Sequence, residues 1–216
     1  MSLRGIAGVI LAAGESSRMG RDKALLPWPP PASNNSRPTE STILSSAIQA
    51  FSEFCDEVLV VAGKNEAALR LVAYAEGASV VPNPAPERGQ FSSLQTGLQE
   101  VLNRGRDSAM VTLVDRPPPR RETIEQLVTA FMRREHGIWA VVPEHAGKHG
   151  HPILVGREMI TAFLEAPMTA NAREIEHANQ KRIQYLAVDD PLVTTNVDTP
   201  ASYDSLKSLI HRNNDV

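Results

Sequence analysis

Short apolar runs alternate with longer amphipathic stretches along most of the chain. Residues 6–11 form a continuous apolar run, which is typical of a central strand covered on both faces. Other runs with the length and composition of strands lie at 57–62, 78–81, 109–114, 138–142 and 183–188. Residues 152–155 are a candidate for an additional edge strand. Strands separated by amphipathic segments predict a mostly parallel sheet.

The segments between these runs carry the period of amphipathic helices. Within 42–54, apolar residues recur at spacings of three and four and define one face. Similar patterns occur at 65–74, 91–103, 121–134 and 172–180. Thr199 and Pro200 fit the N-cap and first position of a last helix. The prediction is an α/β fold with a Rossmann-like, mostly parallel sheet flanked by helices, formed by one domain over residues 1–216.

Residues 28–39 interrupt this alternation. They are rich in proline, serine and asparagine, so they continue neither a helix nor a central strand. We expect a Pro-rich surface loop inserted between two standard elements. The alternative is a lid that contacts a bound acceptor, with Trp28 as a stacking surface.

Composition excludes several classes of function. Hydrophobic residues make up 42% and charged residues 22% of the 216 positions, as in an ordinary folded protein. The formal net charge of -3 argues against a nucleic-acid partner held by broad phosphate neutralisation. Cys55 is the only cysteine, so no intramolecular disulfide forms, and a buried thiol is favoured over a catalytic one.

The N-terminal apolar run invites comparison with a signal peptide. It is short, and Arg18, Arg21 and Lys23 follow it closely, so a buried first strand is the better interpretation. No other stretch approaches the roughly 20 apolar residues of a membrane span. We therefore expect a cytoplasmic protein with no membrane partner.

Small and basic residues follow the first strand. Residues 11–14 read Leu-Ala-Ala-Gly, and Arg18 and Lys23 come shortly after. Small side chains let backbone N–H groups approach a phosphate, and the two cations add positive charge. The spacing matches neither the P-loop nor the dinucleotide-binding glycine pattern, which also disfavours a Rossmann-type dehydrogenase. A phosphate site is favoured over a surface turn with solvated charges.

The run L-A-A-G-x-x-x-R-M-G-x-x-K resembles the opening motif of the molybdenum cofactor nucleotidyltransferases, a branch of the NTP-transferase superfamily. The resemblance implies a nucleotidyltransferase (GT-A-like) fold in which this loop wraps an NTP. It implies a nucleotide-binding set of Leu11, Ala12, Ala13, Gly14, Arg18 and Lys23, with the two cations on phosphates.

Residues 89–98 resemble a second segment of that family, G-x-x-x-S-L-x-x-G-L, in which a helix start lies near the nucleoside. This implies nucleotide contacts for Ser92, Ser93 and Gly97. Without the resemblance, a capped helix with a glycine tolerated in its interior would be the preferred interpretation.

Two aspartates are predicted to hold a metal. Asp115 follows the run 109–114, and open α/β sheets bind ligands at the carboxyl ends of their strands. D-R-P resembles the family's magnesium-binding D-x-P motif, and N-V-D-T-P resembles its later D-x-D-T-P motif, of which only Asp198 carries over. An isolated Asp198 would be typical of a helix-start charge. The pair of carboxylates suits Mg²⁺, the expected cofactor.

Three histidines lie between 145 and 151. His145, His149 and His151 invite a zinc site. The family instead carries G-H-P near its acceptor pocket, which matches residues 150–152, so the resemblance implies acceptor binding by His151.

The resemblance implies transfer of a nucleoside monophosphate to a phosphorylated small-molecule acceptor, with release of pyrophosphate. Arg18, Lys23 and Asp115 would be the catalytic residues, acting on charge and orientation rather than as a nucleophile. Ala13 stands where guanylyltransferases of the family generally have Gly, so CTP is favoured over GTP as the NTP. The acceptor would be the molybdenum cofactor, through the terminal phosphate of its pterin.

Three departures from the family pattern bear on the acceptor. They are the 28–39 insertion, the basic Arg116 with extra prolines after Asp115, and residues 169–173, which keep only Arg173 of a longer motif. The alternatives are a sugar- or polyol-phosphate nucleotidyltransferase of the same superfamily and a non-catalytic nucleotide-binding partner of a molybdoenzyme.

Overall fold

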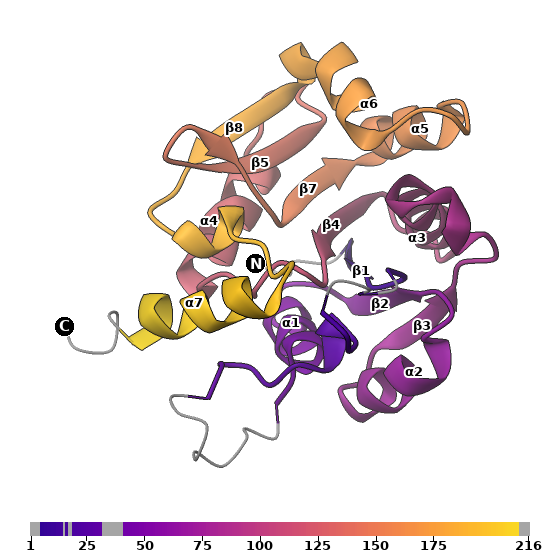
Figure 1. Ribbon diagram of the computed structural model, residues 1–216. Coiled ribbons are helices and arrows are strands. Elements are labelled where there is room, and N and C mark those ends of the chain that lie inside the picture. Colours follow the sequence, from indigo (N-terminus) through magenta and orange to yellow (C-terminus); the bar gives the residue numbers. More distant parts are fainter. Residues whose placement is uncertain (1–4, 15, 17–18, 32–40, 212–216) are drawn as a thin grey trace.

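The structure is a computed structural model, and it describes residues 5–14, 16, 19–31 and 41–211. Within that part, eight strands form one sheet in the order β3-β2-β1-β4-β7-β5-β6, with β8 paired to β5 (Figure 1). The strands are β1 (Ile6–Leu11), β2 (Glu57–Ala62), β3 (Ser79–Pro82), β4 (Ser108–Leu113), β5 (Ala140–His145), β6 (Lys148–His149), β7 (Ile153–Gly156) and β8 (Ile183–Ala187). The predicted α/β fold with a mostly parallel sheet is confirmed.

The position of β7 in the sheet differs from the sequence prediction. β3, β2, β1 and β4 are parallel neighbours, and β8 is parallel to β5. β7 runs antiparallel to both β4 and β5, so the edge position expected for 152–155 is wrong. All four residues of β7 are buried, as an interior strand requires. Pro152 precedes the strand, and its missing N–H therefore removes no ladder hydrogen bond.

Seven α-helices and four short 3₁₀ helices connect these strands in the described ranges. The α-helices are α1 (Ile43–Ser52), α2 (Glu66–Ala75), α3 (Gln90–Asn103), α4 (Arg121–Met132), α5 (Arg157–Glu165), α6 (Ala172–Ala178) and α7 (Pro200–His211). The 3₁₀ helices are η1 (Lys23–Leu25), η2 (Pro86–Arg88), η3 (Gln180–Arg182) and η4 (Pro191–Thr194). Thr199 accepts a hydrogen bond from the Ser202 backbone N–H, as an N-cap does. The sequence pattern had not indicated α5, whose buried face consists of Met159, Ile160 and Phe163.

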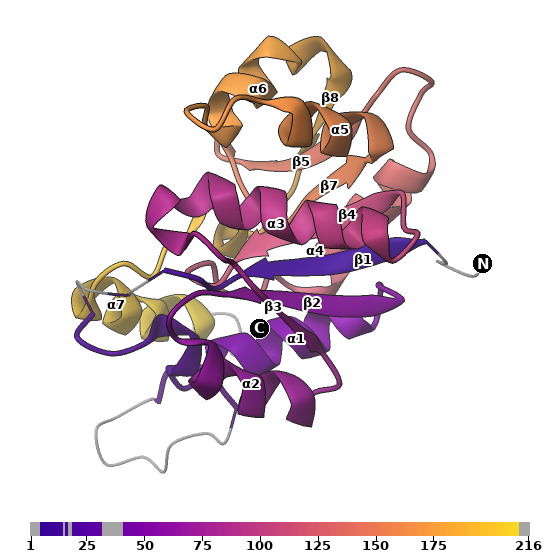
Figure 2. The same ribbon diagram turned by 90° about the vertical axis from the view of Figure 1, so that its right-hand side faces the viewer.

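Alternating strand residues build one hydrophobic core on each face of the sheet. In β1, Ile6 and Ile10 pack with residues of α1, α4 and α7. Val9 and Leu11 point to the other face and pack with residues of α3 and α5. Figure 2 shows α3 lying along the strands on that face. Coverage on both faces explains why every residue of β1 is buried.

Burial bears on two side chains that the sequence offered for a role in the site. Trp28 is 9% exposed within the core that also holds α1, so it offers no stacking surface to a ligand. Residues 32–40 of the Pro-rich loop lie outside the described residues. Burial raises the pKa of the Cys55 thiol, which disfavours the reactive thiolate.

The carboxyl ends of β1 and β4 meet at one edge of the sheet. These neighbouring strands are parallel, so the segments that follow them leave side by side. The Val114 N–H donates to the Leu11 carbonyl at 3.0 Å. None of the described helices has the length and apolar composition to cross a membrane.

Candidate active site

The segment after β1 forms one wall of a cavity of about 170 Å³. Leu11, Ala13, Gly14 and Lys23 all line it, as the motif had suggested. Ala12 does not, because its N–H donates to the Val61 carbonyl at 2.8 Å and its side chain is buried. Ala12 therefore anchors the loop to β2 while its neighbours face the cavity. Arg18, the other predicted phosphate ligand, lies outside the described residues.

The start of α3 forms the opposite wall. Gly89, Gln90 and Ser93 line the cavity. Ser92 does not line it, and its Oγ donates to the Gly89 carbonyl at 2.8 Å and accepts from Asn83 Nδ2 at 2.9 Å. The structure thus gives Ser92 a part in holding the helix start, and Ser93 is the serine of the pair that faces the cavity.

Gly97, which the resemblance placed in the nucleotide-binding set, packs closely against the sheet. A Cβ at this position would lie 2.7 Å from Val9 Cγ1 and 2.9 Å from Val61 Cγ2. Both valines belong to the core between α3 and the sheet. Gly97 is therefore required for close helix–sheet packing, and it faces the interior rather than a ligand.

Lys23 brings the two predicted metal ligands together. Its Nζ donates to Asp198 Oδ1 at 2.8 Å and lies 3.8 Å from Asp115 Oδ2. The Val197 N–H donates to the Asp115 carbonyl at 2.8 Å, which ties the segment before α7 to the end of β4. One ammonium group, 175 residues from Asp198 in sequence, thus offsets part of the charge of a carboxylate pair at the edge of the cavity.

The carboxylate pair fits a divalent cation. Asp115 Oδ1 is buried and has no hydrogen-bond partner among the described residues. Burial raises the pKa of Asp115, and the charges of Lys23 and Arg116 oppose that shift. Two carboxylates beside a cavity match the coordination preference of Mg²⁺, which binds one or two carboxylates and completes its coordination shell with phosphate and water.

A second, larger cavity of about 580 Å³ adjoins the first. Gln90, Leu113 and Asp115 line both. The remaining lining is mostly long and polar, and includes Arg116, His149, His151, Arg173, Glu176, Tyr185 and Asn196. Burial lowers the pKa of Arg116, and Arg116 Nε is buried with no hydrogen-bond partner in the described part of the chain. This cavity therefore presents cationic groups next to Asp115.

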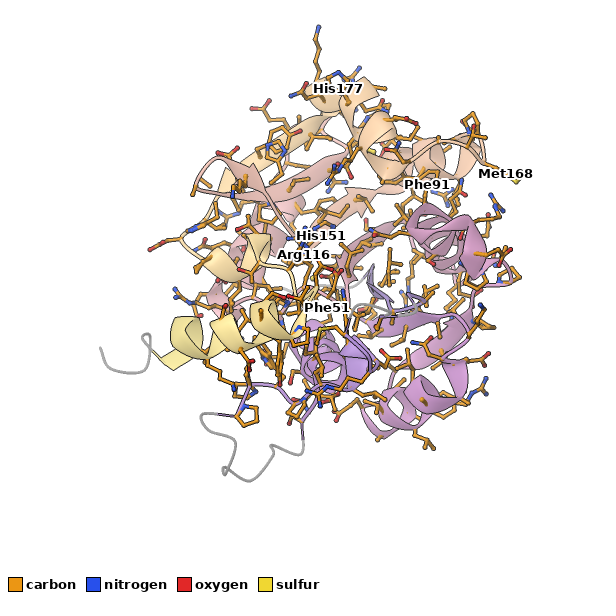
Figure 3. All side chains as sticks on the ribbon, in the orientation of Figure 1. Phe51, Phe91, Arg116, His151, Met168 and His177 are labelled. Atoms are coloured by element: carbon orange, nitrogen blue, oxygen red, sulfur yellow. The ribbon has the colours of Figure 1, made fainter. Side chains whose placement is uncertain are left out.

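His151 lies beside Arg116 at the centre of the molecule (Figure 3). Burial and the Arg116 charge lower its pKa to about 3, so its ring is neutral at physiological pH. Its Nδ1 is enclosed without a hydrogen-bond partner among the described residues. A Cβ at the preceding Gly150 would overlap the Val193 carbonyl, which explains the glycine of G-H-P. The segment is thus held tightly against η4.

The other histidines of this region have separate contacts. His145 Nδ1 lies 3.0 Å from the Val188 carbonyl. His149 stacks on Tyr185 and lies 3.6 Å from Glu144. No group of three or more His, Cys, Asp or Glu side chains able to hold a metal occurs among the residues that the structure describes. The three imidazoles therefore do not form a zinc site.

Several residues of these cavities carry no signal that the sequence patterns indicated. Ser16, Pro86 and Gln90 line the first, and Glu176, Tyr185 and Asn196 line the second. Gln90 lay inside a motif that had been recognised, but only its serines and glycine had been assigned. Glu176 and Tyr185 lie on α6 and β8 with no local sequence signal, so only the fold places them here.

Comparison with known proteins agrees with this geometry. The family model of the MobA-like NTP transferase domain matches residues 8–185. The molybdenum cofactor cytidylyltransferase of Escherichia coli strain K12 is 27% identical over 205 residues, covering 92% of this chain and 94% of that protein. A probable molybdenum cofactor guanylyltransferase of Mycobacterium avium is 31% identical over 123 residues, covering 57% and 56%.

A solved structure shares the fold. A nucleotidyl transferase from Methanothermobacter thermautotroptrophicus, Mth528, superposes with a TM-score of 0.76 at 19% identity, covering 97% of this chain and 99% of that one. The match to the family model spans both walls of the first cavity and Asp115. The chain therefore belongs to the MobA-like NTP transferase domain family and is a nucleotidyltransferase.

Proposed function

We propose that this protein is a Mg²⁺-dependent molybdenum cofactor cytidylyltransferase. It would transfer CMP from CTP to the terminal phosphate of the cofactor's pterin and release pyrophosphate. The observation that carries this proposal is the shared wall of the two cavities. Asp115 lines both, so a nucleotide in the first and a phosphorylated acceptor in the second would meet at the carboxylate pair.

The nucleotide side would be held by the segment after β1 and the start of α3. Ala13, Gly14 and Ser93 face the cavity, and Lys23 supplies positive charge at its edge. Asp115 and Asp198 would hold Mg²⁺, which when bound neutralises phosphate charge. Lys23 would then turn from Asp198 towards the phosphates and, with Arg18, stabilise the leaving pyrophosphate.

The acceptor side would position its phosphate by charge. Arg116 and Arg173 line the second cavity. Their guanidinium groups suit a phosphate dianion, which they would orient for in-line attack on the α-phosphate. Because a phosphate oxygen is already ionised at neutral pH, the reaction needs no strong general base. The neutral His151 would shape the pocket rather than take a proton.

CTP is the preferred donor in this proposal. Ala13 lines the first cavity, and its methyl group takes up space that a glycine would leave to a larger base.

Pyrophosphate release from CTP, GTP and ATP in Mg²⁺, with and without molybdenum cofactor, tests the proposal. Release that requires both CTP and the cofactor is the expected result. Release with GTP in place of CTP would overturn the donor assignment. Tight Mg²⁺-dependent binding of CTP without release would overturn the acceptor assignment and keep the nucleotide site.

A further inference from the structure

The part of the second cavity near α6 is built from groups that the proposed reaction does not use. Figure 3 places His177 of α6 at the top of the molecule, away from Arg116 and His151 at its centre, and all three line this cavity. His149, Glu176 and Tyr185 also line it. We call these last three residues the outer subsite.

A flat aromatic surface forms one part of the outer subsite. The rings of His149 and Tyr185 stack with centroids 4.0 Å apart and planes at 11°. Tyr185 pairs with Val142 of β5, and His149 pairs with Glu144 of the same strand. Because both rings stand on strands that flank β5, the sheet fixes their relative position. Stacked rings of this kind present a π-face to a planar ligand.

A carboxylate forms the other part. Glu176 belongs to α6, whose start is held by a capping box between Asn171 and Glu174. Burial raises the pKa of Glu176, and Arg173 opposes that shift. The Glu176 carboxylate forms no hydrogen bond with the described residues. An ionised carboxylate only accepts hydrogen bonds, so a partly buried one favours a ligand with N–H donors.

The carboxylate and the rings belong to one site. The Glu176 charge acts on the phenol of Tyr185, and together with Glu144 and burial it raises the Tyr185 pKa. The opposite end of the cavity carries Arg116, next to Asp115. The cavity therefore has a cationic end near Asp115, which would bind an anion. Its other end, near α6, is aromatic and carries a carboxylate that can accept hydrogen bonds.

We propose that the outer subsite binds a 2-amino-4-oxopyrimidine ring, such as that of a pterin. The ring would stack on the Tyr185–His149 pair, and its ring N–H and exocyclic amino group would both donate to the Glu176 carboxylate. Two adjacent N–H donors match the two oxygens of a carboxylate. The inference rests on the proposed function, because it names what holds the acceptor's ring while Arg116 and Arg173 hold its phosphate.

Fluorescence titration with free pterin and with lumazine tests this directly. Lumazine carries an oxo group in place of the 2-amino group. Wild-type protein should bind pterin at least tenfold more tightly than lumazine. Glu176→Gln should remove that preference, and Tyr185→Leu should weaken both ligands, whereas Tyr185→Phe should keep the stack. Equal affinity for pterin and lumazine, or an unchanged preference in Glu176→Gln, would overturn the inference.

Glu174→Gln is the matched control. It removes the same charge from the same helix, and Gln at this position still completes the capping box. It should bind pterin as the wild type does. An equal loss in both variants would assign the effect to the charge or stability of α6 and overturn the contact with Glu176.

Turnover separates this inference from the proposed function. If wild type releases pyrophosphate from CTP and cofactor, Glu176→Gln should raise the KM for the cofactor at least tenfold and leave CTP affinity unchanged. A cofactor KM within twofold of wild type would overturn the inference alone. Selective pterin binding without any turnover of CTP would overturn the proposed function and support the subsite.

Discussion

The two cavities that meet at Asp115 are built in different ways. The first uses short side chains and backbone from two continuous stretches, the loop after β1 and the start of α3. The second uses long polar side chains from β6, α6, β8 and the segments around Arg116 and Asn196. The residues of the first cavity therefore belong to short sequence motifs, whereas those of the second come together only through the packing of elements that are distant in sequence.

This difference matches two recognition tasks. A triphosphate can be held by amides and a few cations, which many sequences provide with the same short motif. A larger acceptor needs side chains that reach it from several directions, so its site varies with the chain.

Asp115→Asn should damage both cavities, because this carboxylate lines each of them. Loss of one metal-binding charge is expected to lower kcat/KM by about 10³ and to raise the Mg²⁺ concentration that activity requires. Pyrophosphate release measured across a Mg²⁺ series checks this. Asp107→Asn, at an exposed ion pair with Arg157, is the control. A metal response identical to wild type would contradict the ligand role.

Lys23→Ala should affect the nucleotide side alone. Losing a cation near the phosphates is expected to lower kcat by about 10², with acceptor affinity unchanged. Without metal, the unfolding temperature should fall, because Asp115 and Asp198 lose their shared counter-charge, and added Mg²⁺ should restore it. Calorimetry and initial rates measure the two effects. Wild-type rates in this variant would remove Lys23 from the mechanism.

Gly97→Ala and Gly14→Ala separate packing from binding. A methyl group at 97 would overlap Val9 and Val61, whereas one at 14 meets no atom within 4 Å. Gly97→Ala should lower the free energy of unfolding by about 1–2 kcal/mol, overpacking being partly offset by helix propensity. Gly14→Ala should keep stability and weaken nucleotide binding. Denaturant titration and CTP binding would show the reverse pattern if Gly97 touched the nucleotide.

Arg116→Gln should affect the acceptor side alone. Removing one phosphate-binding cation is expected to raise the KM for the cofactor about tenfold, or about 1.4 kcal/mol, with CTP affinity unchanged. Steady-state rates at varied CTP and varied cofactor measure both. Arg133→Gln, at an exposed position after α4, is the control. Equal changes in both KM values would show that Arg116 acts in the nucleotide site or only through the stability of the fold.

His151 should make the second cavity sensitive to acid. Its pKa is about 3 in the folded protein, against 6.5 for a free imidazole, so folding disfavours its proton. The stability that the neutral ring contributes is complete above pH 6.5 and is lost as the pH falls towards 3. With these two pKa values, protonation of the unfolded chain should make the loss by pH 4.5 about 2–3 kcal/mol.

Denaturant midpoints at pH 7 and pH 4.5 measure this loss, and His151→Gln should lose less stability over that interval than wild type. His177→Gln, at an exposed position, should lose as much as wild type. An equal loss in His151→Gln and wild type would show that His151 is protonated freely in the folded protein.

Regular elements and the nucleotide loop were the most predictable features. Apolar runs with turn residues at each end correctly marked the long strands, since burial on both faces demands such runs. Leu11, Ala13, Gly14 and Lys23 were identified as one group because their positions in the chain are close. α5 and the interior place of β7 were missed, because strand order depends on contacts between residues far apart in sequence.

By itself, then, the sequence determined the α/β class, the nucleotide loop and the family, all of which depend on local patterns of burial and spacing. Tertiary structure alone decided that Ser92 holds a helix start and that Lys23 joins Asp115 to Asp198. It also decided that Glu176 and Tyr185 face the cavity that contains Arg116. The reason is physical: a local pattern states which side chains are buried, but only the packed chain states which of them meet.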